Sequence, residues 1–135
     1  MKITRFEELK IWQQGIKITK QIYDVSAKKE LSKDFALRDQ IRRAVISISA
    51  NIVEGFEKNN NNEFIRYLKI AKGSVGEVRN HLHIALTISY ITIKEFETIN
   101  QQLKELGKQI GSFISYLTTN RRAHEFNSRT NPPTR

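Results

Sequence analysis

The chain has no cysteine among its 135 residues. This absence excludes disulfide bonds, thiolate metal ligands and cysteine nucleophiles. Proline is nearly as rare, since Pro132 and Pro133 are its only examples and both lie close to the C-terminus. Proline is the residue that most strongly interrupts a helix. Residues 1–131 can therefore be helical throughout.

Long hydrophobic runs are also missing. No segment approaches the roughly 18 consecutive apolar residues of a membrane-spanning helix. The first residues, MKITRFEELK, include Glu7 and Glu8 and lack the apolar stretch of a signal peptide. With 39% hydrophobic and 27% charged residues, the composition is typical of a globular domain. We therefore expect one soluble, cytoplasmic domain with no role in a membrane.

Acidic residues are outnumbered by basic ones. The 14 Asp and Glu residues against 23 Lys and Arg residues give a formal net charge of +9. Such a surplus attracts polyanions, among them nucleic acids. The last stretch, RRAHEFNSRTNPPTR, gathers arginine and loses apolar periodicity. We expect a single domain at 1–120 and a flexible, disordered basic tail at 121–135.

Apolar residues recur at helical spacing in four segments. The first segment is predicted to begin at Thr4, where Thr4 and Glu7 match a capping box. Its two apolar stripes are Leu9, Trp12, Ile16 and Tyr23, and Ile11, Ile18, Ile22 and Val25. After the polar stretch SAKKELSKD, a second helix is expected from about Phe35 to the asparagines at 59–62, with Leu37, Ile41, Ala44, Ile48 and Ile52 facing inward.

The third and fourth helices carry start signals of their own. Asn60 with Glu63, and Thr92 with Glu95, have the spacing of capping boxes. The inward positions expected in the third helix are Phe64, Leu68, Ala71, Val75, Val78, Leu82, Ala85 and Ser89, and those in the fourth are Phe96, Ile99, Leu103, Leu106, Ile110, Phe113 and Leu117. The pattern predicts an all-α fold, an antiparallel up-down-up-down four-helix bundle.

Polar residues interrupt this pattern on the second and third helices. In SISANIVEG three polar side chains fall on one stripe, and GSVGEVRNH repeats the arrangement. We interpret them as a hydrogen-bonded network that fixes how the two helices pair. Its expected members are Arg42, Arg43, Ser47, Asn51, Glu54, Ser74 and Glu77. The expected donors to the two carboxylates are Arg42, Arg43 or Arg79, from the same or another subunit. The expected sites of close helix approach are Gly55, Gly73 and Gly76. Gly107 and Gly111 are further glycines inside a predicted helix, the fourth.

Three longer stretches, FEELKIWQQG, FALRDQIRRAVISISANIVEG and EFIRYLKIAKGSVGE, resemble the 23S rRNA-intervening sequence protein family. The resemblance extends over about residues 6–118. It implies a four-helix bundle that assembles as a ring-like homopentamer, and a relation to the basic, nucleic-acid-binding accessory proteins of diversity-generating retroelements. The matching motif positions are Gln40, Arg42, Arg43, Ser47, Asn51, Glu54, Gly55, Gly73, Ser74 and Glu77. The family supplies no catalytic role for any of them.

Two catalytic interpretations compete with the structural one. Glu54, Glu77 and His81 could form a metal or acid/base site, but di-iron bundles use Glu-x-x-His, whereas Glu77 and His81 are separated by three residues. Arg79 and His83 are too close in sequence for a HEPN-type ribonuclease motif. We therefore expect no enzymatic activity, no catalytic residues, no metal and no cofactor.

Basic residues provide the candidate binding surfaces. The candidates for contacting nucleic acid are Lys10, Lys17 and Lys20 on the first helix, and Arg66, Lys69, Lys72 and Arg79 on the third. Aromatic residues such as Trp12 fall on core stripes, which leaves few platforms for base stacking. We expect a homo-oligomer that contacts phosphates of RNA or DNA without strong sequence preference. The alternative is a protein-protein assembly or scaffold module.

Overall fold

The structure is a computed structural model that describes residues 2–120. This part of the chain is helical and contains no strand. Its elements are a short 3-10 helix, η1 (Phe6–Glu8), and five α-helices: α1 (Lys10–Ser26), α2 (Lys29–Lys33), α3 (Phe35–Glu57), α4 (Asn61–Thr87) and α5 (Ile93–Asn120). The predicted tail at 121–135 lies outside the described residues.

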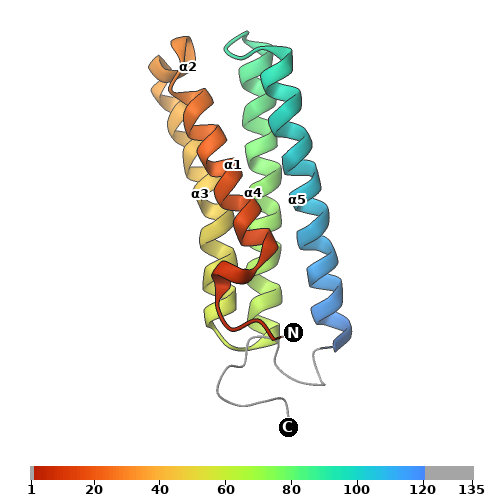
Figure 1. The fold of residues 1–135 in the computed structure, drawn as a ribbon. Coiled ribbons are helices and arrows are strands. Elements are labelled where there is room, and N and C mark those ends of the chain that lie inside the picture. Colours follow the sequence, from red (N-terminus) through yellow and green to blue (C-terminus); the bar gives the residue numbers. More distant parts are fainter. Residues whose placement is uncertain (1, 121–135) are drawn as a thin grey trace.

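The four long helices lie lengthwise beside one another, with α2 near one end of α1 and α3 (Figure 1). Helix α3 packs against α1 and α4, while α5 packs against α4 and α1. The chain passes from α3 to α4 at one end of the molecule and from α4 to α5 at the other (Figure 1). The long helices therefore enclose one interior. No helix within residues 2–120 is both long and apolar enough to cross a membrane.

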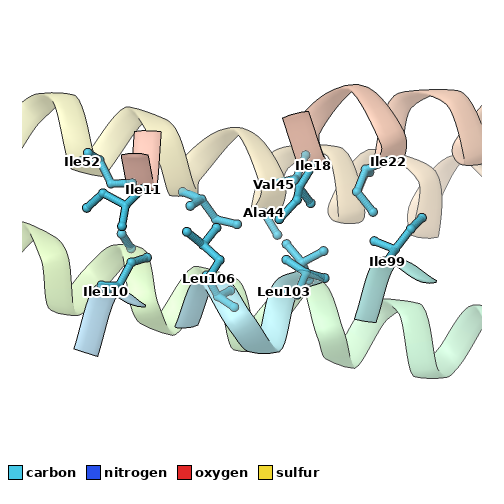
Figure 2. Close-up of a cluster of buried hydrophobic side chains, with 14 of the residues drawn as sticks. Ile11, Ile18, Ile22, Ala44, Val45, Ile52, Ile99, Leu103, Leu106 and Ile110 are labelled. Atoms are coloured by element: carbon cyan, nitrogen blue, oxygen red, sulfur yellow. The ribbon is translucent and has the colours of Figure 1, made fainter. Parts of the chain in front are cut away.

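The interior is built from the predicted apolar stripes of all four long helices. Figure 2 shows side chains of α1, α3 and α5 pointing toward one another between the ribbons. Every inward position predicted for α3 and α4 is buried, except Leu37, which is half-buried, and Ser89. Ser89 lies beyond the end of α4, is exposed and has a φ of 65°. The prediction for Ser89 was wrong because the helix ends at Thr87, and the residue belongs to the turn.

The first predicted helix begins later than its pattern indicated. Leu9 has an extended backbone, with φ −76° and ψ 125°, and separates η1 from α1. Burial of the Leu9 side chain, only 3% exposed, accompanies this break. Glu8, rather than Glu7, accepts a hydrogen bond from the backbone N–H of Thr4 at 3.0 Å. The predicted start at Thr4 was therefore wrong by about two helical turns.

The two apolar stripes of α1 have different surroundings. Ile11, Ile18, Ile22 and Val25 are buried. On the other stripe Ile16 and Tyr23 are exposed, while the Trp12 ring packs edge-on against Phe6 with 5.3 Å between centroids. The guanidinium of Arg42, from α3, lies 4.5 Å from the centre of the Tyr23 ring. The wide apolar surface of α1 is therefore covered on one side only within this chain.

The polar stretch between α1 and α3 was predicted as a connection, yet it contains α2. Leu31 is fully buried and fastens this short helix to the core. Asp34, which follows α2, caps α3, because its Oδ1 accepts a hydrogen bond from the Leu37 N–H at 3.1 Å. Its second oxygen, Oδ2, accepts a hydrogen bond from the Tyr90 hydroxyl at 3.0 Å. Asp34 thus ties the start of α3 to the turn between α4 and α5, which the sequence pattern did not indicate.

The capping residues predicted for α4 and α5 are confirmed. The Asn60 side chain accepts a hydrogen bond from the Glu63 N–H at 2.9 Å. At α5 the capping box is reciprocal: the Glu95 N–H donates to Thr92 Oγ1 at 3.0 Å, and the Thr92 N–H donates to Glu95 Oε1 at 2.9 Å. Lys28 Nζ also lies 3.4 Å from Glu95 Oε2. Ile91 and Phe96, in the hydrophobic-staple positions, are both buried.

Glu95→Gln is expected to make unfolding less sensitive to acid. The Thr92 backbone N–H, and secondarily Lys28, hold the pKa of Glu95 below its usual 4.5. The carboxylate therefore adds stability that is fully present above about pH 4.5 and is lost as the pH falls through the lower folded value. Urea unfolding from pH 7 to pH 3 should show a difference between wild type and variant that shrinks in acid. A difference that stays constant over this range would contradict the expectation, and Glu97→Gln, on the exposed side of α5, is the control.

The contact between α1 and α5 differs from the others because glutamines line it. A hollow of about 260 Å³ is bordered by Gln14, Lys17, Gln102, Glu105, Leu106 and Gln109. The side-chain oxygens of Gln21, Gln102 and Gln109 are buried and have no hydrogen-bond partner among the described residues. Buried polar groups of this kind are ordinarily satisfied by water. We call this polar contact between α1 and α5, with Gln14, Gln21, Gln102 and Gln109, the glutamine seam.

Candidate nucleic-acid interface

A basic groove runs between α4 and α5. It has a volume of about 390 Å³ and is lined by Lys72, Val75, Gly76, Arg79, Leu103, Lys104, Gly107, Lys108 and Gly111. Each helix contributes two cations to this α4–α5 groove, and none of its lining residues, all within the described part of the chain, is acidic. Like charges gathered in a concave surface attract an anion more strongly than the same charges dispersed. The groove is therefore the best candidate for binding phosphates.

Helical spacing explains how these residues come together. Lys72, Gly76 and Arg79 follow one another at intervals of four and three, so they share one side of α4. Lys104 and Lys108 are four residues apart and share one side of α5. Because α4 and α5 pack against each other, the two basic stripes face the same groove.

Glycine shapes the floor of the groove. A Cβ atom on Gly111 would lie 3.3 Å from Cε of Lys72, so the aliphatic part of this lysine lies close to the backbone of α5. A Cβ atom on Gly107 would lie 3.6 Å from Val75 Cγ1, which is ordinary contact. Gly76 has open space where its side chain would be. The floor is therefore free of side chains at one point on α4, where a ligand can approach the backbone.

Arg79 is the most firmly held of the four cations. Its Nε donates a hydrogen bond to Asn100 Oδ1 of α5 at 2.9 Å. This bond orients the planar guanidinium at the edge of the groove and links the two helices. A pre-oriented guanidinium loses less entropy on binding a phosphate than a lysine does.

The other predicted binding residues lie elsewhere. Lys10, Lys17 and Lys20 are exposed on α1, where Lys20 pairs with Asp24 at 2.9 Å and Lys17 borders the glutamine seam. On α4, Lys69 and Arg66 are exposed but do not line the groove. Arg66 donates to Glu63 at 3.0 Å, and this bond raises the pKa of the guanidinium. The seven predicted cations therefore do not form one surface.

Lys104 and Lys108 were missed by the sequence reasoning. Their signal was present, because they flank Gly107 on a helix that also carries Gly111. Two lysines four residues apart are common on exposed helix faces, however. Only the packing of α5 against α4 shows that this pair faces Lys72 and Arg79.

A smaller polar contact joins α3 and α4. The Ser74 hydroxyl donates to Ser47 Oγ at 2.9 Å, and the Asn51 amide donates to Ser47 Oγ at 2.9 Å and to the Ser47 carbonyl oxygen at 2.8 Å. Ser74 is 7% exposed, so the contact is largely shielded from water. A shielded and satisfied polar contact favours one helix register over others. Three of the predicted network residues are thus brought together.

The charged residues assigned to the same network lie outside it. Glu54 is exposed and lies 3.7 Å from Lys58, and Glu77 is exposed and lies 3.6 Å from Nε2 of His81. Arg43 is exposed, and Arg42 Nε instead donates to Ser26 Oγ of α1 at 2.8 Å. Within residues 2–120 the predicted arginines do not lie against these carboxylates: Glu54 pairs with Lys58, and Glu77 lies beside His81, each one helical turn away. Donation by arginines of another subunit stays a prediction.

The three glycines of the predicted close approach differ from one another. A Cβ atom on Gly55 would lie 2.7 Å from Tyr67 Cβ and 3.0 Å from Phe64 Cδ1, so only glycine fits this contact of α3 with α4. At Gly73 and Gly76 nothing lies within 4 Å of the position a Cβ would take. Close approach is therefore confirmed at Gly55, whereas Gly73 and Gly76 face open space within the chain.

No group of three or more His, Asp or Glu side chains in residues 2–120 is arranged to hold a metal ion. Glu77 and His81 are neighbours on α4, but Glu54 is paired with Lys58 on α3. The geometry therefore gives no support to a metal site formed by Glu54, Glu77 and His81.

These observations define a class: a small all-helical protein whose candidate site is a basic surface groove between two helices. The family model for 23S rRNA-intervening sequence proteins matches residues 7–112. The chain therefore belongs to the 23S rRNA-intervening sequence protein family.

A solved structure supports the same fold. It is the crystal structure of a protein of unknown function from the S23 ribosomal protein family of Bacteroides thetaiotaomicron. The two structures superpose with a TM-score of 0.71 at 28% sequence identity, covering 77% of this chain and 97% of the other. No curated protein matches the chain.

Proposed function

We propose that this protein is a non-enzymatic, cytoplasmic homo-oligomer that binds phosphates of structured RNA or DNA through its basic surfaces. The observation that carries the proposal is the α4–α5 groove, where four cations converge without a lining carboxylate. Membership of a family named for an intervening sequence of rRNA supports nucleic acid as the polyanion. The net charge of +9 favours association at long range.

The proposed architecture is an antiparallel up-down-up-down four-helix bundle formed by a single domain at residues 1–120. The connections at alternate ends of the long helices support it (Figure 1). The order of contacts, from α1 to α3, α4, α5 and back to α1, agrees with this topology. Homopentameric assembly and a relation to the accessory proteins of diversity-generating retroelements rest on the sequence resemblance alone.

Self-association is supported by a largely exposed stripe on α4 and its C-cap residue Ile88. Its members, at spacings of three and four, are Ile70, Gly73, Glu77, His81, Ile84 and Ile88. The three isoleucines are 40–45% exposed. Both ring nitrogens of His81 are buried without a hydrogen-bond partner among the described residues. Exposed apolar groups beside unsatisfied polar ones are typical of a surface that meets another chain.

The experiment is fluorescence anisotropy of a labelled structured RNA and a matched DNA duplex at several salt concentrations, with the oligomer mass determined by light scattering. If the oligomer neutralises roughly 6–10 phosphates, the affinity should fall by about 10³–10⁵ between about 50 and 200 mM salt. A monomeric mass would refute the homo-oligomer. Absence of binding even at low salt would refute the nucleic-acid proposal.

The second candidate is a scaffold module that binds another protein. The exposed isoleucines of α4 favour it, because an apolar stripe contributes to protein interfaces. Complex formation through this stripe should depend weakly on salt, whereas phosphate binding should depend on it steeply. The salt titration therefore separates the two functions.

A further inference from the structure

We propose that the α4–α5 groove receives the sugar-phosphate backbone of double-helical nucleic acid; this inference rests on the proposed function and assigns it to one site. The cations stand on both walls, Lys72 and Arg79 on α4 and Lys104 and Lys108 on α5. A strand lying in the groove therefore meets positive charge on both sides. Lysine and arginine on opposite walls also hold the strand along the direction of the helices.

The length of the basic surface suits several phosphates. Lys72 and Arg79 are seven residues apart, which at 1.5 Å per residue is about 10 Å along α4. Each strand of a duplex carries one phosphate per ~3.4 Å of axis, so about three phosphates of the strand in the groove fall within this span. The four cations can thus contact about three consecutive phosphates of one strand without any need to bend the nucleic acid.

The lining of the groove disfavours unstacked bases. None of the groove's lining residues, which all belong to residues 2–120, is aromatic. Proteins that bind single strands combine a basic groove with aromatic side chains on which the bases stack. A duplex keeps its bases stacked inside and presents its phosphates outward, so the groove suits a duplex better than a single strand.

The glycines on the floor of the groove leave room for a ligand. Open space at Gly76 lets a phosphate descend between the walls. The Cε atom of Lys72 lies near the backbone of Gly111 across the groove. A large side chain at Gly76 should therefore block the floor while leaving all four charges in place.

The test compares the full wild-type chain with three variants of it. Each variant must first show the circular-dichroism spectrum and oligomer mass of the wild type, and a melting temperature that is no lower. The groove variant is Lys72→Gln/Lys104→Gln/Lys108→Gln, which leaves Arg79 and its bond to Asn100 intact. The matched control, Lys29→Gln/Lys33→Gln/Lys94→Gln, removes the same charge from exposed positions away from the groove. The filled variant is Gly76→Leu. The ligands are a labelled RNA duplex, a matched DNA duplex and an unstructured single strand.

The expected result is salt-steep binding of both duplexes by the wild type, and weaker binding of the single strand. The groove variant should lose at least tenfold in affinity and about 3 units of salt slope per engaged subunit, since each phosphate contact contributes ~0.9. The control should change affinity by less than threefold. Gly76→Leu should also lose at least tenfold with no change in net charge.

Contrary results separate the two proposals. If the wild type binds no duplex at low salt, the proposed function itself fails. If the wild type binds but the groove variant and the control lose equally, or if Gly76→Leu binds normally, binding occurs elsewhere and only the groove assignment fails. Preference for the single strand would also overturn the duplex assignment. A preference between the RNA and DNA duplexes would identify the natural source of the phosphates.

Discussion

Gly55→Ala is expected to destabilise the protein by about 1–3 kcal/mol, the usual effect of inserting a methyl group into a filled interior. The new Cβ would lie 2.7 Å from Tyr67 Cβ and 3.3 Å from Phe64 Cα. The backbone of α4 and the root of a tyrosine side chain would both have to move, since neither is the flexible end of a side chain. Urea unfolding followed by circular dichroism measures the change.

A matched control exists on α4, because Gly76→Ala adds the same methyl group where nothing lies within 4 Å. Alanine in a helix is favoured over glycine by about 1 kcal/mol, so this variant should be more stable than the wild type. Opposite signs at the two positions are the expected result. A Gly55→Ala variant as stable as the wild type would show that α3 and α4 lie further apart than the structure places them.

Phe64→Ala is expected to have the largest effect on folding, about 3–5 kcal/mol. Phe64 is fully buried and contacts the rings of Phe56 and Phe113 edge-on, with centroids 5.9 Å and 5.4 Å away. The three rings come from α3, α4 and α5, so the cavity would open where three helices meet. Domains of ordinary stability have 5–15 kcal/mol in total. The variant should therefore melt far below the wild type.

The control for this prediction is Phe35→Ala at the start of α3. Phe35 is 65% exposed, and its ring contacts the Arg38 guanidinium at 4.7 Å. Loss of such an exposed cation–π contact costs about 0.5–1 kcal/mol. If thermal unfolding showed equal losses for the two phenylalanines, the location of the core around Phe64 would be wrong.

Most helix ends were predictable because their signals are local. Asn60 and Thr92 accept hydrogen bonds from backbone N–H groups three residues ahead, which depends only on sequence spacing. The inward stripe of α4 was predictable for a similar reason, since periodicity reports which face is apolar. Thr4 was misleading because the same spacing occurs where the backbone at Leu9 is extended.

Features that depend on packing between helices could not be predicted in the same way. Gly55 and Gly73 look alike in the sequence, yet one lies against Tyr67 and the other faces open space. Lys104 and Lys108 face the groove because of how α5 is rotated about its own axis, and sequence spacing does not reveal that rotation. Helix α2 was missed because a five-residue helix with one buried leucine has no readable period.

The glutamine seam has a consequence for the order in which the chain folds. Helices α3, α4 and α5 are consecutive, so their contacts form through short loops with little loss of chain entropy. The seam joins α1 to α5, and the Lys28–Glu95 pair at its end links residues 67 positions apart. A distant contact lined by amides is expected to form late. The α4–α5 groove lies between consecutive helices, so its formation does not require the distant contact between α1 and α5.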